Sequence, residues 1–279
     1  MSNYYCLVAG LPDVAFDGSK SAYTVERFKE DIYPELSADD AACVDLFFLE
    51  RDNANILAIL RKGEDAVIEQ YGRYSREELE EIISSAKNGD TPINGVPSYI
   101  YRFFEYYIAN ESNTNVIWED ALSAFYYEYA TKCPNRFVAE WFTFNRNVNN
   151  LLVAFAARKY KMNIAEAVIG DDEIAEALRT SGARDFGLTG ALDYFESVQR
   201  MSENSRLQER ERQLDDIRWQ WLENNSVFNY FTVERLFVFL LKLSIIERWS
   251  KLDADKGMER YNEMIAELKS GMDGKSVEL

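Results

Sequence analysis

The side chains of this chain that could do chemistry are its carboxylates, because the sequence contains no histidine. Without an imidazole there is no Ser-His-Asp or Cys-His nucleophile and no histidine ligand for a metal ion. Paired acids that act as acid and base, or an oxygen-ligand site for magnesium or calcium, remain open. The acidic runs to consider are Ser75–Glu81 (SREELEE) and Gly170–Glu173 (GDDE).

Both acidic runs stand where helices are expected to begin. Carboxylates in a first helical turn accept hydrogen bonds from free backbone N–H groups and interact favourably with the helix dipole. We therefore interpret the two runs as helix starts, and we expect no catalytic residue, no metal site and no cofactor. A carboxylate-based, metal-dependent enzyme stays an alternative.

The three cysteines, Cys6, Cys43 and Cys133, are widely spaced and odd in number. Their spacing contains no Cys-x-x-Cys pair, so it indicates neither a zinc site nor a disulfide framework. We expect three buried, reduced thiols in a cytoplasmic protein.

The composition argues against two classes of partner. The 279 residues are 47% apolar, enough to bury a full core, and they carry 48 acidic against 31 basic side chains, a net charge of −17. This charge repels nucleic acid, and no dense Lys/Arg cluster offsets it. The most apolar stretch, Val227–Trp249, contains five charged side chains, so we expect a buried helix there and no insertion into a membrane.

The elements that must position these residues are predicted to be helices almost throughout. All five prolines fall at or before Pro134, so the second half can form long, uninterrupted helices. Ser37 with Asp40, and Ser75 with Glu78, resemble capping boxes. Apolar spacing, caps and glycine stops predict helices over residues 37–61, 75–88, 98–110, 115–132, 135–160, 171–180, 190–203, 206–223, 232–252 and 255–269.

The first apolar run, NYYCLVAGLPDVAFD from Asn3 to Asp17, has three interpretations. A secretion signal lacks its basic start, and a phosphate-binding loop lacks its glycines, because Gly10 stands alone. The remaining interpretation is a buried, extended element over Tyr4–Val8 that is stopped by Pro12. The predicted fold class is therefore all-α, or nearly so, with a short extended N-terminal segment.

Two of the predicted helices carry a similar string. Residues 48–62 read FLERDNANILAILRK, and residues 144–159 read FNRNVNNLLVAFAARK. Asparagine within a helix is costly unless its amide is hydrogen-bonded, so we expect buried polar contacts, and the repetition points to duplicated helical units. Local caps and packing between helices are the alternative explanation, and neither explanation requires a substrate pocket. The positions that we single out are Asn55, Arg61, Asn150 and Arg158.

The chain resembles an uncharacterised bacterial family that lies among V-type ATPase genes. The resemblance rests on Tyr-Tyr-x-Leu-Val-Ala-x-Leu-Pro at Tyr4–Pro12 and on the segment Ile217–Trp249. That family resembles the C/d subunit of V/A-type rotary ATPases, which is built from three related helical bundles with repeated Asn-Leu strings. The strings at Asn55 and Asn150 look like two of these, and Glu247 with Arg248 resembles the closing helix of the third bundle, although the asparagines are missing there.

This resemblance implies two or three related helical bundles, which we place at residues 1–95, 96–189 and 190–279, or one continuous domain. It implies a non-catalytic coupling subunit whose partners are the central stalk and the membrane ring of the ATPase. The chain would then be cytoplasmic and peripheral to the inner membrane, held there by the complex. A helical protein-binding adaptor is the alternative outside this family.

Aromatic side chains surround two of the predicted helices, at residues 99–107 and 125–129. A helix with aromatics on most of its faces either lies at the centre of a core or presents some of them to a partner. We single out Tyr106 and Tyr126 as candidate contacts with the stalk, and a central core helix is the alternative.

Overall fold

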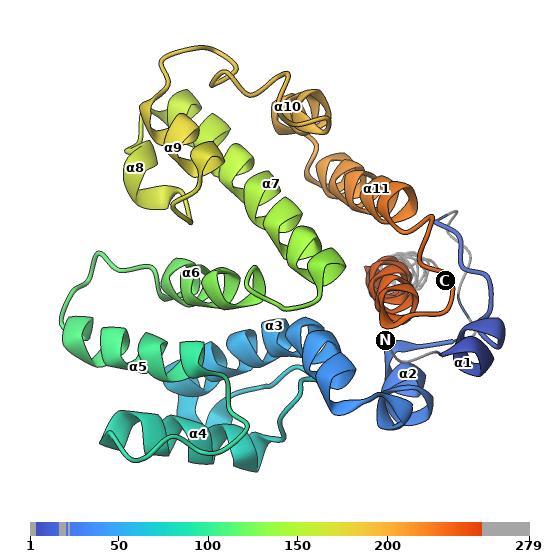
Figure 1. Ribbon diagram of the computed structural model, residues 1–279. Coiled ribbons are helices and arrows are strands. Elements are labelled where there is room, and N and C mark those ends of the chain that lie inside the picture. The colour runs from blue at the N-terminus through green and yellow to red at the C-terminus, as the bar shows by residue number, and fades with distance from the viewer. Residues whose placement is uncertain (1–3, 17–20, 22, 253–279) are drawn as a thin grey trace, which may run out of the picture.

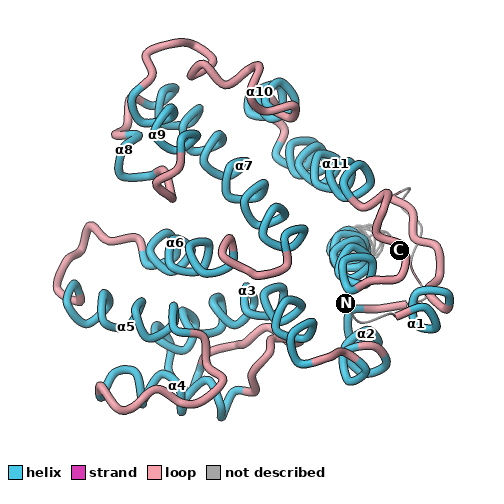
Figure 2. Tube along the Cα trace, in the orientation of Figure 1, coloured by secondary structure: helices cyan, strands magenta, loops and turns pink. Residues whose placement is uncertain are grey.

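The structure is a computed structural model that describes residues 4–16, 21 and 23–252, and within these residues the fold is all-α with no β-strand (Figure 1, Figure 2). The predicted fold class is therefore confirmed. The helix predicted over residues 255–269 lies outside the described residues.

The longer helices follow the predicted order, and short helices are additional to the predicted set. The helices are α1 (Tyr5–Ala9), α2 (Val25–Asp31), α3 (Ala38–Lys62), α4 (Arg76–Asn88), α5 (Ser98–Asn110), α6 (Trp118–Ala130), α7 (Arg136–Tyr160), α8 (Ile164–Ala167), α9 (Glu173–Thr180), α10 (Phe195–Glu203) and α11 (Leu207–Asn225). The additional helices are α1, α2 and α8. Two short 3-10 turns, η1 (Tyr33–Glu35) and η2 (Gly63–Asp65), flank α3. A further helix over residues 233–252 follows α11, and we call it the terminal helix.

The predicted caps begin the helices. Ser37 accepts a hydrogen bond from the first turn of α3, and Ser75 with Glu78 forms a complete capping box at α4. Asp172 accepts the N–H of Ala175 at 2.9 Å and begins α9. The carboxylates of Glu78 and Asp172 thus serve as caps, as their position in the sequence indicates. Helices α3 and α4 end at the predicted glycines, Gly63 and Gly89.

The start of the chain differs from the prediction. Residues predicted as a buried, extended element form the short helix α1, and Tyr5 is 57% exposed. A lone strand leaves its backbone groups unpaired, whereas a helical turn pairs them internally. Tyr4 is buried and anchored: its N–H donates to the Phe231 carbonyl at 2.9 Å, and its hydroxyl donates to Asp40 at 2.6 Å.

The proline-free second half is more interrupted than predicted. Between α7 and α10 the chain forms only α8 and α9, of four and eight residues, and the helix predicted from residue 190 begins at Phe195. Gly170 and Gly187 adopt φ angles of +95° and +75°, which break a helix without any proline.

Two groups of helices share one continuous apolar core. Helices α3 to α6 pack on one another, and α7 packs against α8, α9 and α10. The groups meet where α6 contacts α7, while α11 and the terminal helix lie on the same side of the molecule as α1 and α2 (Figure 1). The predicted division at residue 95 falls between α4 and α5, which pack together.

The terminal helix supplies much of this core, as its apolar sequence predicts. Its fully buried side chains are Leu236, Phe237, Leu240 and Leu243. Among the described helices, none combines the length and the hydropathy that a membrane span requires.

Candidate functional site

Asn55 and Asn150 make the same pair of hydrogen bonds in two parts of the molecule. Asn55, on α3, donates to the Glu69 carbonyl at 3.1 Å and accepts the Glu69 N–H at 2.6 Å. Asn150, on α7, donates to the Ile169 carbonyl at 2.7 Å and accepts the Ile169 N–H at 2.9 Å. After each helix the chain turns and runs back along it. Each amide thus pairs with both the N–H and the carbonyl of one residue in this returning segment.

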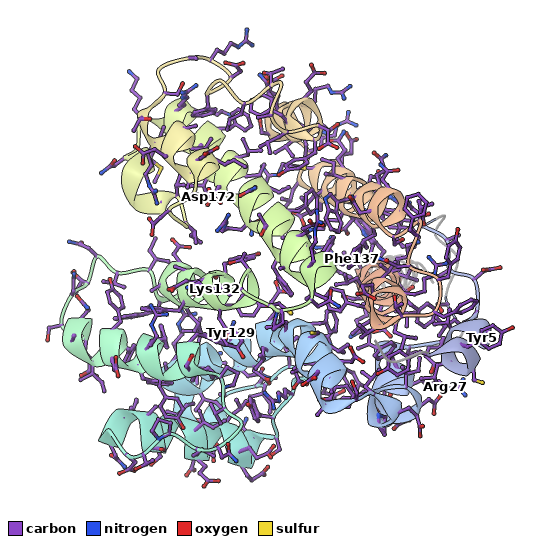
Figure 3. The ribbon with its side chains drawn as sticks, in the orientation of Figure 1. Tyr5, Arg27, Tyr129, Lys132, Phe137 and Asp172 are labelled. Atoms are coloured by element: carbon purple, nitrogen blue, oxygen red, sulfur yellow. The ribbon has the colours of Figure 1, made fainter. Side chains whose placement is uncertain are left out.

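A charged side chain about one turn earlier also binds each returning segment. On α3, the Asp52 carboxylate accepts the N–H of Arg73 at 2.9 Å. On α7, the Arg146 guanidinium pairs with Asp172, which lies beside α7 (Figure 3). We call each arrangement a helix–return unit: α3 with residues 66–75, and α7 with residues 161–172.

A glycine lies against the charged side chain in each unit. A Cβ added at Gly72 would collide with the Asp52 carboxylate, and one added at Gly170 would lie 2.9 Å from Nη1 of Arg146. Sequence reasoning missed these four residues. The available signal was a charged residue three or four positions before each asparagine, together with a glycine after the helix.

The two arginines of the repeated strings have different partners. Arg61 pairs with Glu119 of α6, and both side chains are about half exposed. Arg158 donates to the carbonyls of Ser181, Ala183 and Arg184 at 2.8, 2.6 and 3.0 Å. Its guanidinium also lies 3.5 Å from the centre of the Phe186 ring. Arg158 therefore holds the loop after α9, whereas Arg61 forms a surface ion pair.

Glu247 and Arg248 join the terminal helix to other helices. Glu247 accepts the N–H of Val25 at the start of α2, at 2.6 Å. Arg248 pairs with Asp215 of α11, and the Trp249 indole N–H donates to the same carboxylate at 2.7 Å. These bonds connect one helix to another, whereas Asn55 and Asn150 connect a helix to its own returning segment.

The two tyrosines proposed as partner contacts differ in burial. Tyr126 is 2% exposed and its hydroxyl donates to the Leu46 carbonyl at 2.6 Å, so its side chain lies in the core, as the alternative of a central helix predicts. The reason is the central position of α6, which packs against α3, α5 and α7. Tyr106 is 38% exposed and packs on the rings of Trp118 and Phe125 at the surface.

The cysteines only partly match their prediction. Cys6 lies exposed on the surface helix α1, which corrects the expectation of three buried thiols. Cys43 is buried and Cys133 is half-buried, and both are free thiols.

A cleft of about 700 Å³ lies between the two helix–return units. Its walls come from α3 and α6 on one side and from α7 and residues 162–169 on the other. Apolar side chains form much of the lining, including Leu57, Leu152 and Val153. Asn150 holds residue 169 of one wall, and the opposite wall includes α3, the helix that carries Asn55, so this cleft is the candidate functional site of the chain.

Acidic groups and amides provide the polar part of the cleft. The Glu50 side chain lines the cleft and is exposed to solvent. Burial raises the pKa of Asp120. On α7, Asn149 donates to the Tyr127 hydroxyl at 3.1 Å. The cleft is thus suited to an apolar group that also carries hydrogen-bond donors or positive charge.

The third acid of the cleft, Glu119, is already paired. Its hydrogen bond with Arg61 holds the pKa of Glu119 below the ordinary value. Within the part of the chain that the structure describes, no three histidine, cysteine, aspartate or glutamate side chains gather closely enough to hold a metal ion.

One family model matches the chain over residues 1–272, and its description is "Protein of unknown function (DUF2764)". Comparison with curated proteins and with solved structures finds no match. The matched range contains both helix–return units and the terminal helix. The description of the family names no activity and no partner.

Proposed function

We propose that this chain, which belongs to the DUF2764 family of proteins of unknown function, is a non-catalytic coupling subunit of a bacterial V/A-type ATPase. In this role it links the central stalk to the membrane ring at the cytoplasmic face of the inner membrane. The observation that carries the proposal is the repeated helix–return unit. The C/d subunit, which the sequence resembles, is built from related helical bundles, and a duplicated unit fits that plan.

The bonds within each unit suit a part that transmits force. A coupling subunit must keep its helices in register under load. Each asparagine is buried, and its amide makes two hydrogen bonds to the backbone of one residue, so breaking these bonds leaves a buried amide without its partners. The same arrangement on α3 and α7 stiffens both walls of the cleft.

A helical protein-binding adaptor is the second candidate, and an exposed aromatic loop favours it. After α11, Phe228 and Tyr230 are 88% and 63% exposed. Tyr5 projects at the same edge of the molecule, with its ring 4.6 Å from that of Phe231 (Figure 3). Exposed aromatic groups of this kind are typical of protein interfaces. The loop is compatible with both candidates, since a coupling subunit also binds proteins.

Purification of the tagged, full-length chain from the membranes of its own source separates the candidates. We expect stalk and ring subunits of the ATPase to copurify with one copy of this chain per complex. Deleting the chain should reduce ATP-driven ion transport in membrane vesicles and leave ATP hydrolysis by the soluble part intact. Copurification with unrelated proteins, together with unchanged ion transport, would contradict the coupling role and favour the adaptor.

A further inference from the structure

Cys43 and Cys133 meet where α3 passes the connection between α6 and α7. Their Sγ atoms lie 3.4 Å apart, although 90 positions separate the two residues in the sequence. Cys43 lies in the second turn of α3 and is 7% exposed, and Cys133 directly follows the end of α6. The fold therefore brings two free thiols into direct contact.

The pair lines a surface pocket of about 690 Å³. One wall is the first part of α3, and the opposite wall is formed by Tyr129, in the last turn of α6, and by Lys132, in the turn after it (Figure 3). Cys133 is only half-buried. A small oxidant can consequently reach the Cys133 sulfur from the solvent, whereas Cys43 lies behind it.

Cys133 is the thiol that ionises first. Its contact with the Cys43 thiol lowers the pKa of Cys133, and the backbone N–H of Asn135 acts in the same direction. The same contact and burial raise the pKa of Cys43. Because the thiolate is the reactive form, oxidation begins at Cys133, and Cys43 is placed to react second.

We propose that Cys43 and Cys133 are a redox modification site, which hydrogen peroxide converts to a reversible disulfide. In the first step the Cys133 thiolate attacks one peroxide oxygen. The S–O bond forms, the O–O bond breaks, and the released hydroxide takes up a proton to become water. In the second step Cys43 attacks the sulfenic sulfur of Cys133. The S–S bond forms, the S–O bond breaks, and the Cys43 proton leaves with the hydroxide as a second water. The two thiols give up two electrons, which reduce the peroxide.

The disulfide would fasten α3 to the segment that leads into α7. These helices carry the two helix–return units, so the bond limits movement of one wall of the cleft relative to the other. A dithiol reductant reverses the reaction. This inference is independent of the proposed coupling role, since it rests on the contact, the exposure and the ionisation of the two thiols.

The test uses the full-length protein with the Cys6→Ser substitution, because the exposed Cys6 thiol could otherwise link two molecules. The protein is treated with hydrogen peroxide, its remaining thiols are blocked, and its peptides are mapped by mass spectrometry without reductant. We expect Cys43 and Cys133 in one linked peptide pair that dithiothreitol separates. The oxidised protein should also unfold at a higher temperature, by about 5–10 °C, because the bond closes a long loop.

Two single variants, each also carrying Cys6→Ser, test the order of the steps. Cys43→Ser should accumulate a sulfenic acid at Cys133, which dimedone traps. Cys133→Ser should react with peroxide roughly tenfold more slowly. A stable sulfenic or sulfinic acid at Cys133 in the Cys6→Ser protein, with Cys43 still free, would overturn the proposal. So would the absence of reaction at both thiols under conditions that oxidise Cys6 in the unmodified protein.

Discussion

At the scale of single residues, the Asp52 side chain is 0% exposed and accepts the backbone N–H groups of Arg73 and Tyr74 at 2.9 and 3.5 Å. Burial raises its pKa to about 7, and the two N–H bonds and the charge of Lys29 oppose this shift. The folded protein therefore keeps a proton at this carboxyl group over a pH range in which the unfolded chain has lost it.

The sign of the resulting pH dependence follows from proton counting. Between about pH 4 and pH 7 the folded state binds more protons at Asp52 than the unfolded state, so the free energy of unfolding falls as the pH rises. The slope from one such group is at most about 1.4 kcal/mol per pH unit. The contribution of Asp52 to the free energy of unfolding is most favourable at low pH. It is lost as the pH rises through the pKa that this carboxyl group has in the folded protein.

Replacing Asp52 with asparagine should flatten this dependence. Asp52→Asn keeps an oxygen that can accept one N–H group and removes the titrating proton. Urea unfolding at a series of pH values between about 4 and 8 should show a shallower fall in the variant than in the unmodified protein. Asp65→Asn, at an exposed acid in η2, is the matched control. Equal slopes in Asp52→Asn and the unmodified protein would contradict the assigned role of Asp52.

At the scale of elements, the helix–return unit is the repeated feature of the chain. Local sequence decides where its helix begins and ends, because caps and glycine stops act within three or four residues. The path of the returning segment depends instead on one amide that lies 14 residues away from it in the first unit and 19 residues away in the second. This difference in length is accommodated by α8, which is present only in the second unit's return segment.

Removing the amide of Asn150 should loosen its own unit. Asn150→Ala leaves both backbone groups of Ile169 without their partner, which costs about 2–4 kcal/mol in the free energy of unfolding. Amide hydrogen exchange should rise over residues 164–170. Asn55→Ala should raise amide hydrogen exchange over residues 66–72 and leave exchange in the second unit unchanged.

The neighbouring Asn149 is the control for Asn150. It lies half-buried on the same helix and donates to the Tyr127 hydroxyl at 3.1 Å. Asn149→Ala should cost less than about 1.5 kcal/mol, the usual value of one hydrogen bond, and should leave exchange at residues 164–170 unchanged. Equal losses for the two substitutions would show that the paired bonds of Asn150 have no special role.

At the scale of the whole molecule, contacts between the two ends of the described chain close the fold. Tyr4 donates to the Phe231 carbonyl, and Glu247 accepts the N–H of Val25, so α1 and α2 are bound to the last described segments (Figure 1). Asp215 holds α11 to the terminal helix. It is 1% exposed and binds Arg248 and Trp249 together.

Loss of the Asp215 carboxylate should release the terminal helix. Asp215→Ala removes the acceptor that Arg248 and the Trp249 indole N–H share, while Arg248, which is 40% exposed, keeps its pairing with Glu211. We expect a loss of about 1–3 kcal/mol in the free energy of unfolding, chiefly from the unsatisfied indole N–H. The near-ultraviolet circular dichroism of the tryptophans should weaken below the unfolding transition. Asp216→Ala, at the adjacent and less buried acid, is the control and should cost clearly less. If both substitutions have the same effect, the contact between α11 and the terminal helix does not depend on Asp215.

The all-α class, the order of the longer helices and the caps at Ser37, Ser75 and Asp172 were predictable from the sequence. These features depend on hydrogen bonds and apolar spacing within one or two helical turns, so a single chain segment contains the information. The repeated asparagines were also visible, because asparagine inside an apolar helix requires a partner. The sequence did not show that this partner is the returning backbone.

Which distant groups meet depends on the packing of whole helices and could not be predicted from the sequence. Tyr126 is buried because α6 has helices around it, and the tyrosine pattern alone fits a central or an exposed helix equally well. The opening segment forms α1 because no strand lies beside it among the described residues. Arg61 and Arg158 close similar strings yet bind different partners, and Cys43 meets Cys133 across 90 positions. Such contacts depend on how whole helices pack, and no spacing within one segment specifies them.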